Sequence, residues 1–173
     1  MRYLPFTLLP LLLVACTDQG PVAPDVSSVF VAGAGMNKVD IIGTIESTGS
    51  GAAGRSITTP SGMCHLWKPV FTDYTGDIVG VMTFHEQQHL KCDFSRFVGS
   101  GRVEGDVTWN GRDGIISGQW TTNCKPDALQ PLGISCDGTM NVRGSGGLEG
   151  VRFHMKWGPG WYPFPYTGTA SYR

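Results

Sequence analysis

Two copies of one short glycine-rich pattern constrain the fold of this chain more than any other feature of its sequence. The first copy begins with Gly99-Ser100-Gly101 and ends at Trp109, and the second begins with Gly144-Ser145-Gly146 and ends at Trp157. After the opening glycines, each copy has an aliphatic residue, a Glu-Gly pair and then alternating apolar and polar residues. Strict alternation predicts a strand with one buried face, because successive side chains of a strand point to opposite sides. The copies therefore predict equivalent turn-plus-strand units of an antiparallel β structure.

Short alternating stretches recur along most of the remaining sequence. With the repeats at 100–109 and 151–157, they predict strands at 39–46, 63–74, 77–91, 115–121, 136–143 and 166–172. Asn110-Gly111 predicts a tight hairpin, because the turn that this pair favours needs positive φ angles. Residues 48–62 are rich in Gly, Ser, Thr and Ala and predict a mobile loop. Seven or eight regularly spaced strands without an amphipathic helix predict an all-β barrel or sandwich.

A further resemblance favours the barrel. The second repeat enters its strand through a turn of the type Gly-Ser-Gly-x-Leu-x-Gly, and a late aromatic strand, Phe164-Pro165-Tyr166-Thr167-Gly168-Thr169, follows it. This combination resembles the allene oxide cyclase-like barrel superfamily, to which plant dirigent proteins and many secreted bacterial proteins are similar. Over residues 76–172 the resemblance implies one antiparallel, calycin-like barrel, which we expect to occupy residues 37–173. It also implies a cyclase or isomerase as an alternative function, but no active-site motif matches, so no catalytic residue is predicted.

The N-terminus has the pattern of a bacterial lipoprotein signal. A positive start is followed by a short apolar run and by Leu13-Val14-Ala15-Cys16. The apolar run is too short to span a bilayer, which takes about 20 residues. We therefore expect residues 1–15 to be removed, Cys16 to carry the lipid anchor, and residues 16–36 to form a flexible linker. An ordinary secretory signal is the alternative. Thr17 gives no inner-membrane retention signal, so the outer membrane or the cell surface is the expected location in the cell envelope.

The charge distribution argues against nucleic acid as a partner. The formal net charge is −1, and charged residues make up 16% of the chain against about 25% in typical proteins. No cluster of Lys and Arg occurs that would neutralise phosphates along one face. The expected partners are therefore the membrane, through the lipid anchor, and a small ligand.

Four cysteines remain once Cys16 is set aside, an even number in an exported chain. They allow three pairings. Cys124 and Cys136 flank one long loop between two predicted neighbouring strands, which favours a disulfide between them and therefore a second one between Cys64 and Cys92. A zinc site is the alternative, although none of the four lies in a Cys-x-x-Cys pair.

The segment His85-Glu86-Gln87-Gln88-His89 matches the His-Glu-x-x-His pattern of zinc metalloproteases. That chemistry requires a helix, in which two histidines four residues apart lie on one face. The β-rich residues before the segment predict instead that 84–89 is extended, with the two histidines about 13 Å apart. A zinc hydrolase using His85, Glu86 and His89 is thus an alternative, and no metal or other cofactor is predicted.

Alternating aromatic residues and prolines fill the stretch from Trp157 to Tyr166. Because each proline removes a backbone donor, the stretch predicts a stiff loop at one end of the barrel. Its aromatic faces suit an apolar or sugar ligand, and the candidate binding residues are Trp157, Trp161, Tyr162, Phe164 and Tyr166. The alternative is a structural role, in which the aromatic residues close one end of the core and bind no ligand. The sequence as a whole predicts a lipid-anchored, non-catalytic barrel that binds a small ligand or has a structural role.

Overall fold

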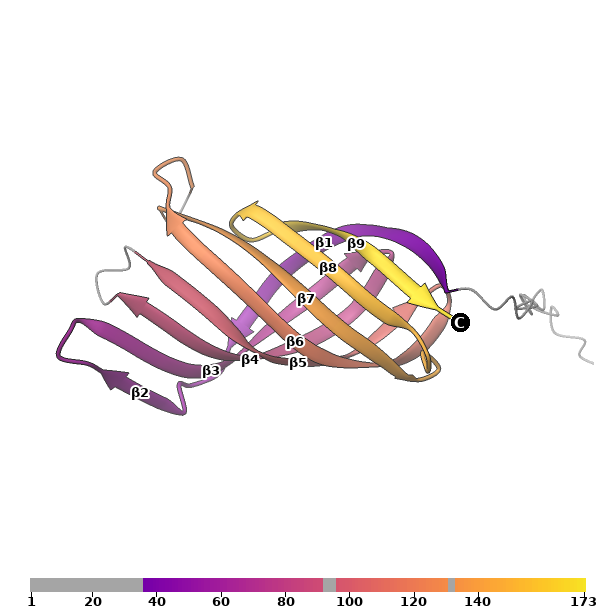
Figure 1. Cartoon of the computed structure of the whole chain (residues 1–173), viewed down its shortest axis with the longest axis horizontal. Coiled ribbons are helices and arrows are strands. Elements are labelled where there is room, and N and C mark those ends of the chain that lie inside the picture. The colour runs from indigo at the N-terminus through magenta and orange to yellow at the C-terminus, as the bar shows by residue number, and fades with distance from the viewer. Residues whose placement is uncertain (1–35, 92–95, 131–132) are drawn as a thin grey trace, which may run out of the picture. The chain divides into compact units, whose positions relative to one another are not determined.

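The chain forms a single antiparallel sheet without helices over residues 36–91, 96–130 and 133–173, which a computed structural model describes (Figure 1). The all-β class predicted from the alternating pattern is therefore confirmed. The strands are β1 (Asn37–Ser50), β2 (Arg55–Thr58), β3 (Met63–Gly76), β4 (Ile78–Lys91), β5 (Phe97–Trp109), β6 (Arg112–Pro126), β7 (Ile134–Gly146), β8 (Arg152–Gly160) and β9 (Phe164–Tyr172). The predicted signal peptide, the lipidation site Cys16 and nearly all of the linker lie outside the described residues.

Eight of the nine strands close into a ring. Neighbours in sequence pair from β3 to β9, and β1 completes the ring by pairing with β9 on one side and with β3 on the other. The result is barrel-like, as the sequence predicts. β2 stands outside the ring and pairs with β3 alone.

The prediction of a loop over residues 48–62 is wrong in part. β1 continues to Ser50, and β2 adds a short strand that pairs with β3 from Arg55 to Thr58. This polar segment becomes a strand because β3 extends beyond the end of β1 and leaves backbone groups without a partner. Pro69, predicted to mark an edge or bend, lies where β3 changes its partner from β1 to β2.

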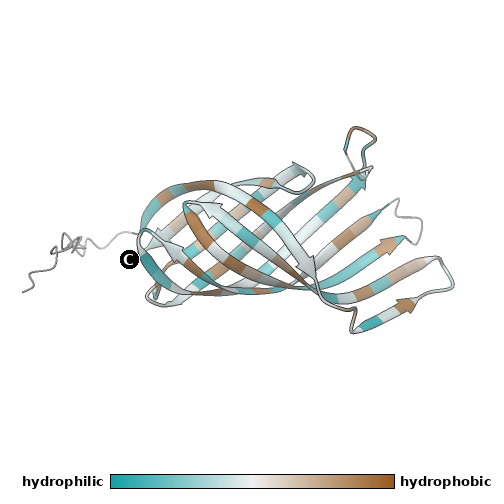
Figure 2. Cartoon of the chain, turned by 180° about the vertical axis from the view of Figure 1, so that it is seen from behind, coloured by the Kyte–Doolittle hydropathy of each residue, from teal (hydrophilic) through white to brown (hydrophobic). Residues whose placement is uncertain are grey.

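Apolar and polar residues alternate along the strands (Figure 2). The alternation places most of the large apolar side chains inside the ring, whereas Val79, Val81 and Ile115 are exposed. At the end of the ring near the C-terminus, Trp109 packs edge-on against Phe153 at 5.5 Å and against Tyr172 at 5.8 Å between ring centroids. Leu148 and Val151 are completely buried beside them. This end and the middle of the ring are filled with side chains.

The two glycine-rich repeats do not form equivalent turns, which corrects the prediction. The second repeat does turn the chain, between β7 and β8. In the first repeat, Gly99, Ser100 and Gly101 lie inside β5. A methyl group at Gly99 would lie 2.9 Å from Cη2 of Trp120, so this glycine makes room for an indole ring on the neighbouring strand.

The predicted hairpin and one predicted disulfide are confirmed. Asn110 and Gly111 have φ angles of 51° and 71° and join β5 to β6, as the Asn-Gly pair predicts. Cys124 and Cys136 are bonded and lie directly opposite each other on β6 and β7. The other predicted pairing involves Cys92, which lies outside the described residues.

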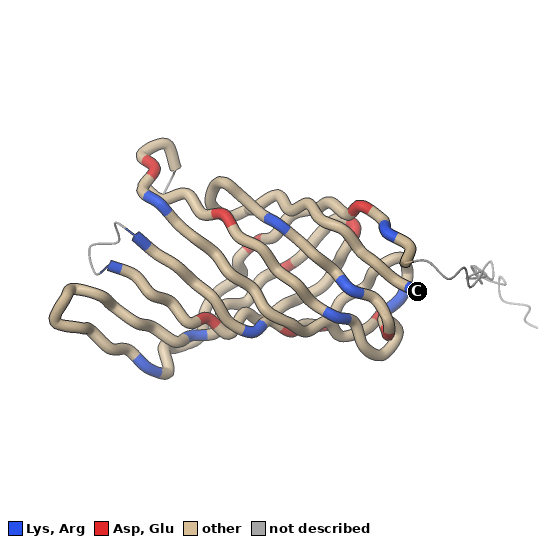
Figure 3. The backbone as a smooth tube through the Cα atoms, in the orientation of Figure 1, with Lys and Arg blue, Asp and Glu red and all other residues tan. Residues whose placement is uncertain are grey.

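Charged residues are distributed over many strands of the ring (Figure 3). Lys and Arg residues occur on every strand except β9 and are interspersed with Asp and Glu. Within the part of the chain that the structure describes, no helix is long and apolar enough to cross a membrane.

Candidate functional site

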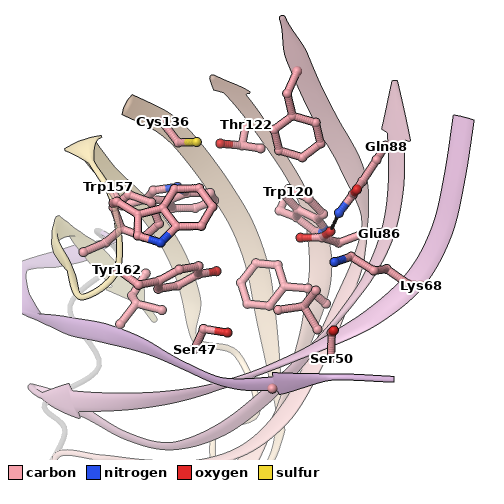
Figure 4. Close-up of a pocket in the computed structure, with 17 residues that line it drawn as sticks. Ser47, Ser50, Lys68, Glu86, Gln88, Trp120, Thr122, Cys136, Trp157 and Tyr162 are labelled. Atoms are coloured by element: carbon pink, nitrogen blue, oxygen red, sulfur yellow. Dashed lines mark hydrogen bonds between the residues drawn. The ribbon is translucent and has the colours of Figure 1, made fainter. Parts of the chain in front are cut away.

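A cavity of about 410 Å³ lies inside the ring, at the end opposite the Trp109 cluster (Figure 4). All eight strands of the ring contribute side chains to it. The lining residues are Ile45, Ser47, Gly49, Ser50, Lys68, Val70, Phe84, Glu86, Gln88, Phe97, Trp120, Thr122, Cys136, Trp157, Trp161, Tyr162 and Phe164. The interior of the ring is therefore filled at one end and hollow at the other.

Aromatic rings make up one wall and the base of the cavity. Phe84 packs edge-on against Trp120 at 5.2 Å and against Trp157 at 6.3 Å between ring centroids. These three side chains are nearly inaccessible to solvent and belong to β4, β6 and β8. The wall is rigid because its rings also form part of the core.

A second aromatic group comes from the turn between β8 and β9. Trp161 contacts Tyr162 at 5.7 Å and Phe164 at 6.4 Å, and Tyr162 contacts Phe164 at 4.6 Å. Trp161 and Tyr162 are half-buried, whereas Phe164 is buried. The turn thus presents two accessible rings to the cavity and anchors them on a third ring in the core.

Polar side chains from β3 and β4 face this aromatic turn (Figure 4). Lys68 and Glu86 are register partners, and the amide of Gln88 donates a hydrogen bond to the carboxyl group of Glu86. Burial raises the pKa of Glu86, and the hydrogen bond from Gln88 and the charge of Lys68 oppose that rise. The pKa of the Tyr162 hydroxyl is also raised, first by burial and then by the nearby Glu86. The cavity therefore holds a carboxyl group that is easier to protonate than an exposed one.

One buried donor at the cavity has no partner. The indole Nε1 of Trp120 is buried and makes no hydrogen bond within the described part of the chain. An unpaired buried N–H costs about 1–3 kcal/mol. Because this atom is inaccessible to solvent, it offers no contact to a molecule in the cavity.

The expectation that residues 84–89 are extended is confirmed, because they lie within β4. The strand separates the members of the His-Glu-x-x-His motif. Glu86 lines the cavity, whereas His85 lies 52% exposed with its Nε2 3.3 Å from Glu104 Oε1, and His89 contacts His65. The motif therefore does not bring its two histidines together. Residues 36–91, 96–130 and 133–173 contain no group of three or more His, Cys, Asp or Glu side chains able to hold a metal ion.

Four of the five predicted aromatic residues surround the cavity. Trp157, Trp161, Tyr162 and Phe164 line it. Tyr166 does not, because it is buried in the core, where its hydroxyl accepts a hydrogen bond of 3.0 Å from the N–H of Ile78. The predicted loop is also shorter than expected, since Trp157 and Pro159 belong to β8 and Phe164 begins β9.

The polar side of the cavity is absent from the binding site that the sequence predicts. Lys68, Glu86, Gln88 and Thr122 occupy inward positions of their strands, in phase with buried residues of the same strands. The sequence contains one sign of this polar side, namely polar residues at the alternate positions of a strand that are otherwise occupied by inward-facing apolar residues. In β4, for example, Met82 and Phe84 are followed at the same phase by Glu86 and Gln88.

Comparisons with known proteins identify no relative. No family model, curated protein or solved structure matches the chain. A functional assignment therefore rests on the geometry of the cavity.

The raised pKa of Glu86 predicts a pH-dependent stability difference. Because folding favours the protonated carboxyl, Glu86 contributes to stability. The contribution is fully present below the ordinary pKa of 4.5 and is lost as the pH rises through the raised pKa that Glu86 has in the folded state. Glu86→Gln removes the contribution, so we expect the variant to gain stability relative to the wild type as pH rises from about 4 to about 8. Urea unfolding at several pH values measures this difference.

The control is Glu104→Gln, which removes a carboxylate that is 52% exposed on the neighbouring strand. The comparison uses the free energy of unfolding of the wild type minus that of each variant. The assigned burial of Glu86 would be contradicted if this difference stays constant with pH for Glu86→Gln, or if it is the same for Glu86→Gln and Glu104→Gln.

Proposed function

We propose that residues 37–173 form a binding module for one small apolar or sugar ligand, held in the cavity at the open end of the ring. The volume of about 410 Å³ lies in the range of about 300–1,000 Å³ that is typical of small-molecule sites. The observation that carries the proposal is the composition of the walls, in which aromatic rings face a small set of convergent polar groups.

The walls indicate the shape of the ligand. Trp161 and Tyr162 offer accessible ring faces, and a flat apolar molecule or the apolar face of a sugar ring packs well on such surfaces. Glu86, Gln88 and Thr122 provide polar atoms on other strands. A ligand with one flat face and a hydrogen-bonding edge matches both sides of the cavity.

Binding can be tested with Trp161→Ala. Removing the half-buried Trp161 takes away one accessible face of the cavity, so binding should weaken by about tenfold, or about 1.4 kcal/mol. The probes are 1-anilinonaphthalene-8-sulfonate and a panel of mono- and disaccharides, followed by fluorescence and calorimetry. Trp67→Ala is the matched control, because Trp67 lies on β3 outside the cavity, under the guanidinium of Arg55.

Two results would count against the proposal. The first is a wild-type protein that binds none of the probes, or binds them equally well after Trp161→Ala. The second is a stability loss of about 3–5 kcal/mol in Trp161→Ala, which is the scale of a buried Trp truncation and would make the turn a core plug.

A proton-transfer enzyme is the second candidate, and the position of Glu86 favours it. A buried carboxyl with a raised pKa beside a ligand cavity can exchange a proton with a bound molecule. A cyclase or isomerase, as the superfamily resemblance implies, would use such a group. Deuterium incorporation into a bound ligand, abolished by Glu86→Gln while binding persists, would select this function. Binding without exchange would select the binding module.

The location of the module remains a proposal from the sequence. Anchoring through a lipid on Cys16 would place the cavity in the cell envelope, with residues 16–36 as a tether. In that setting the ligand would reach the cavity from the aqueous phase.

A further inference from the structure

Two histidines face each other across β3 and β4 on the outer surface of the sheet. His65 and His89 are register partners, and their Nδ1 atoms are 2.6 Å apart. The rings are perpendicular, with an interplanar angle of 85° and centroids 4.6 Å apart. Both side chains are half-buried. Two potential ligand atoms therefore lie within hydrogen-bond distance of each other at the protein surface.

The pair is separate from the cavity. Glu86 and Gln88 face inward from β4, so the residues at alternate positions, His85 and His89, face outward. On β3, His65 packs against Trp67, with ring centroids 6.4 Å apart and an interplanar angle of 25°. This packing restricts the His65 ring while its Nδ1 remains directed at the opposite histidine.

We propose that His65 and His89 form the protein half of a copper(II) site. Imidazole nitrogen is a preferred ligand of copper, which binds most N-donor sites more tightly than the other first-row divalent ions. A proton now occupies the space between the two nitrogens, because a contact of 2.6 Å between them needs one donor and one acceptor. A divalent ion would bind both Nδ1 atoms once that proton moves through solvent to Nε2 of the same ring and both rings turn, so that their Nδ1 lone pairs meet at the ion instead of at each other.

The distance between the nitrogens favours copper over zinc. With metal–nitrogen bonds of about 2.0 Å, two adjacent ligands of a square-planar ion lie about 2.8 Å apart, and two ligands of a tetrahedral ion about 3.3 Å apart. From the observed 2.6 Å, the square-planar arrangement requires the smaller movement. Side-chain rotation alone supplies a change of this size, so the strands keep their register. Water completes the coordination at this partly exposed position.

The experiment is a titration of the full chain with Cu²⁺, followed by electron paramagnetic resonance and calorimetry. We expect one ion per chain with nitrogen hyperfine structure from two imidazoles. His65→Gln and His89→Gln should each weaken binding by at least about tenfold, because each removes one of two ligands. Cu²⁺ should also raise the Tm of the wild type, since an ion that binds the folded state stabilises it. That rise should disappear in both variants.

The matched control is the double variant His85→Gln/His154→Gln. Both histidines are exposed on strands, but they contact Glu104 at 3.3 Å and Asn141 at 2.7 Å instead of another histidine. The control should bind Cu²⁺ like the wild type. The proposal is overturned if Cu²⁺ binds equally well to His65→Gln and His89→Gln, if the control loses the two-imidazole signal, or if Cu²⁺ does not raise the Tm of the wild type. The Tm measurement on the wild type keeps the test decisive even if a Gln variant does not fold.

Discussion

Removal of the Cys124–Cys136 disulfide should lower the free energy of unfolding by about 3 kcal/mol. The bond joins residues 12 positions apart that are directly paired on β6 and β7, and both side chains are buried. Without the bond, the unfolded chain gains the freedom of that loop. In a domain of this size, the expected decrease in Tm is about 10 °C.

The double variant Cys124→Ala/Cys136→Ala tests this expectation by urea and thermal unfolding. Its matched control is Thr121→Ala/Thr139→Ala, which removes a non-covalent pair between the same two strands, with hydroxyls 3.3 Å apart. We expect the control to lose at most about 1 kcal/mol. Equal losses in the two double variants would show that the covalent link adds nothing beyond side-chain contact.

Gly138→Ala should also destabilise the protein strongly. Gly138 lies on β7 opposite Trp157, and a methyl group there would lie 2.3 Å and 2.4 Å from two carbons of the indole ring. The carbonyl oxygen of Thr121 would be only 2.6 Å away. Since Trp157 is held by the surrounding core, neither neighbour can withdraw, and overpacking of this kind costs about 1–3 kcal/mol.

Gly54→Ala is the control, because the nearest heavy atom to a methyl group there is 3.9 Å away. It should change the free energy of unfolding by less than about 0.5 kcal/mol. The double variant Gly138→Ala/Trp157→Phe should lose less free energy of unfolding than the sum of the losses in the two single variants. The reason is that the smaller phenyl ring leaves room for the methyl group. Strictly additive losses, or a Gly138→Ala protein as stable as Gly54→Ala, would contradict the described packing.

Local sequence patterns predict most of the fold. Alternation locates eight of the nine strands, and Asn110-Gly111 locates a hairpin, because both signals depend on neighbouring residues alone. The patterns do not reveal β2, because its pairing depends on the unpaired edge of a distant part of β3. They also place a turn at the first Gly-Ser-Gly, because the sequence does not show that Trp120 lies above Gly99.

The candidate site is predictable from the sequence only in its aromatic half. The spacing of aromatic residues and prolines points to Trp161 and Tyr162, which do line the cavity. Glu86 stands out in the sequence for a different reason, because it belongs to the His-Glu-x-x-His motif, which needs a helix to bind a metal. In the structure Glu86 lies on β4, and its side chain points into the ring. Lys68 approaches Glu86 through a cross-strand register that the sequence does not specify.

Ring closure also limits how copies of this chain can associate. Sheets aggregate by adding strands at their unpaired edges. Among the described strands, β2 is the one with a partner on one side only, and it is four residues long. Arg55 at its start places a positive charge on that edge, so two copies meeting edge to edge would bring like charges together. Edge-to-edge growth through β2 thus has a short and charged starting point.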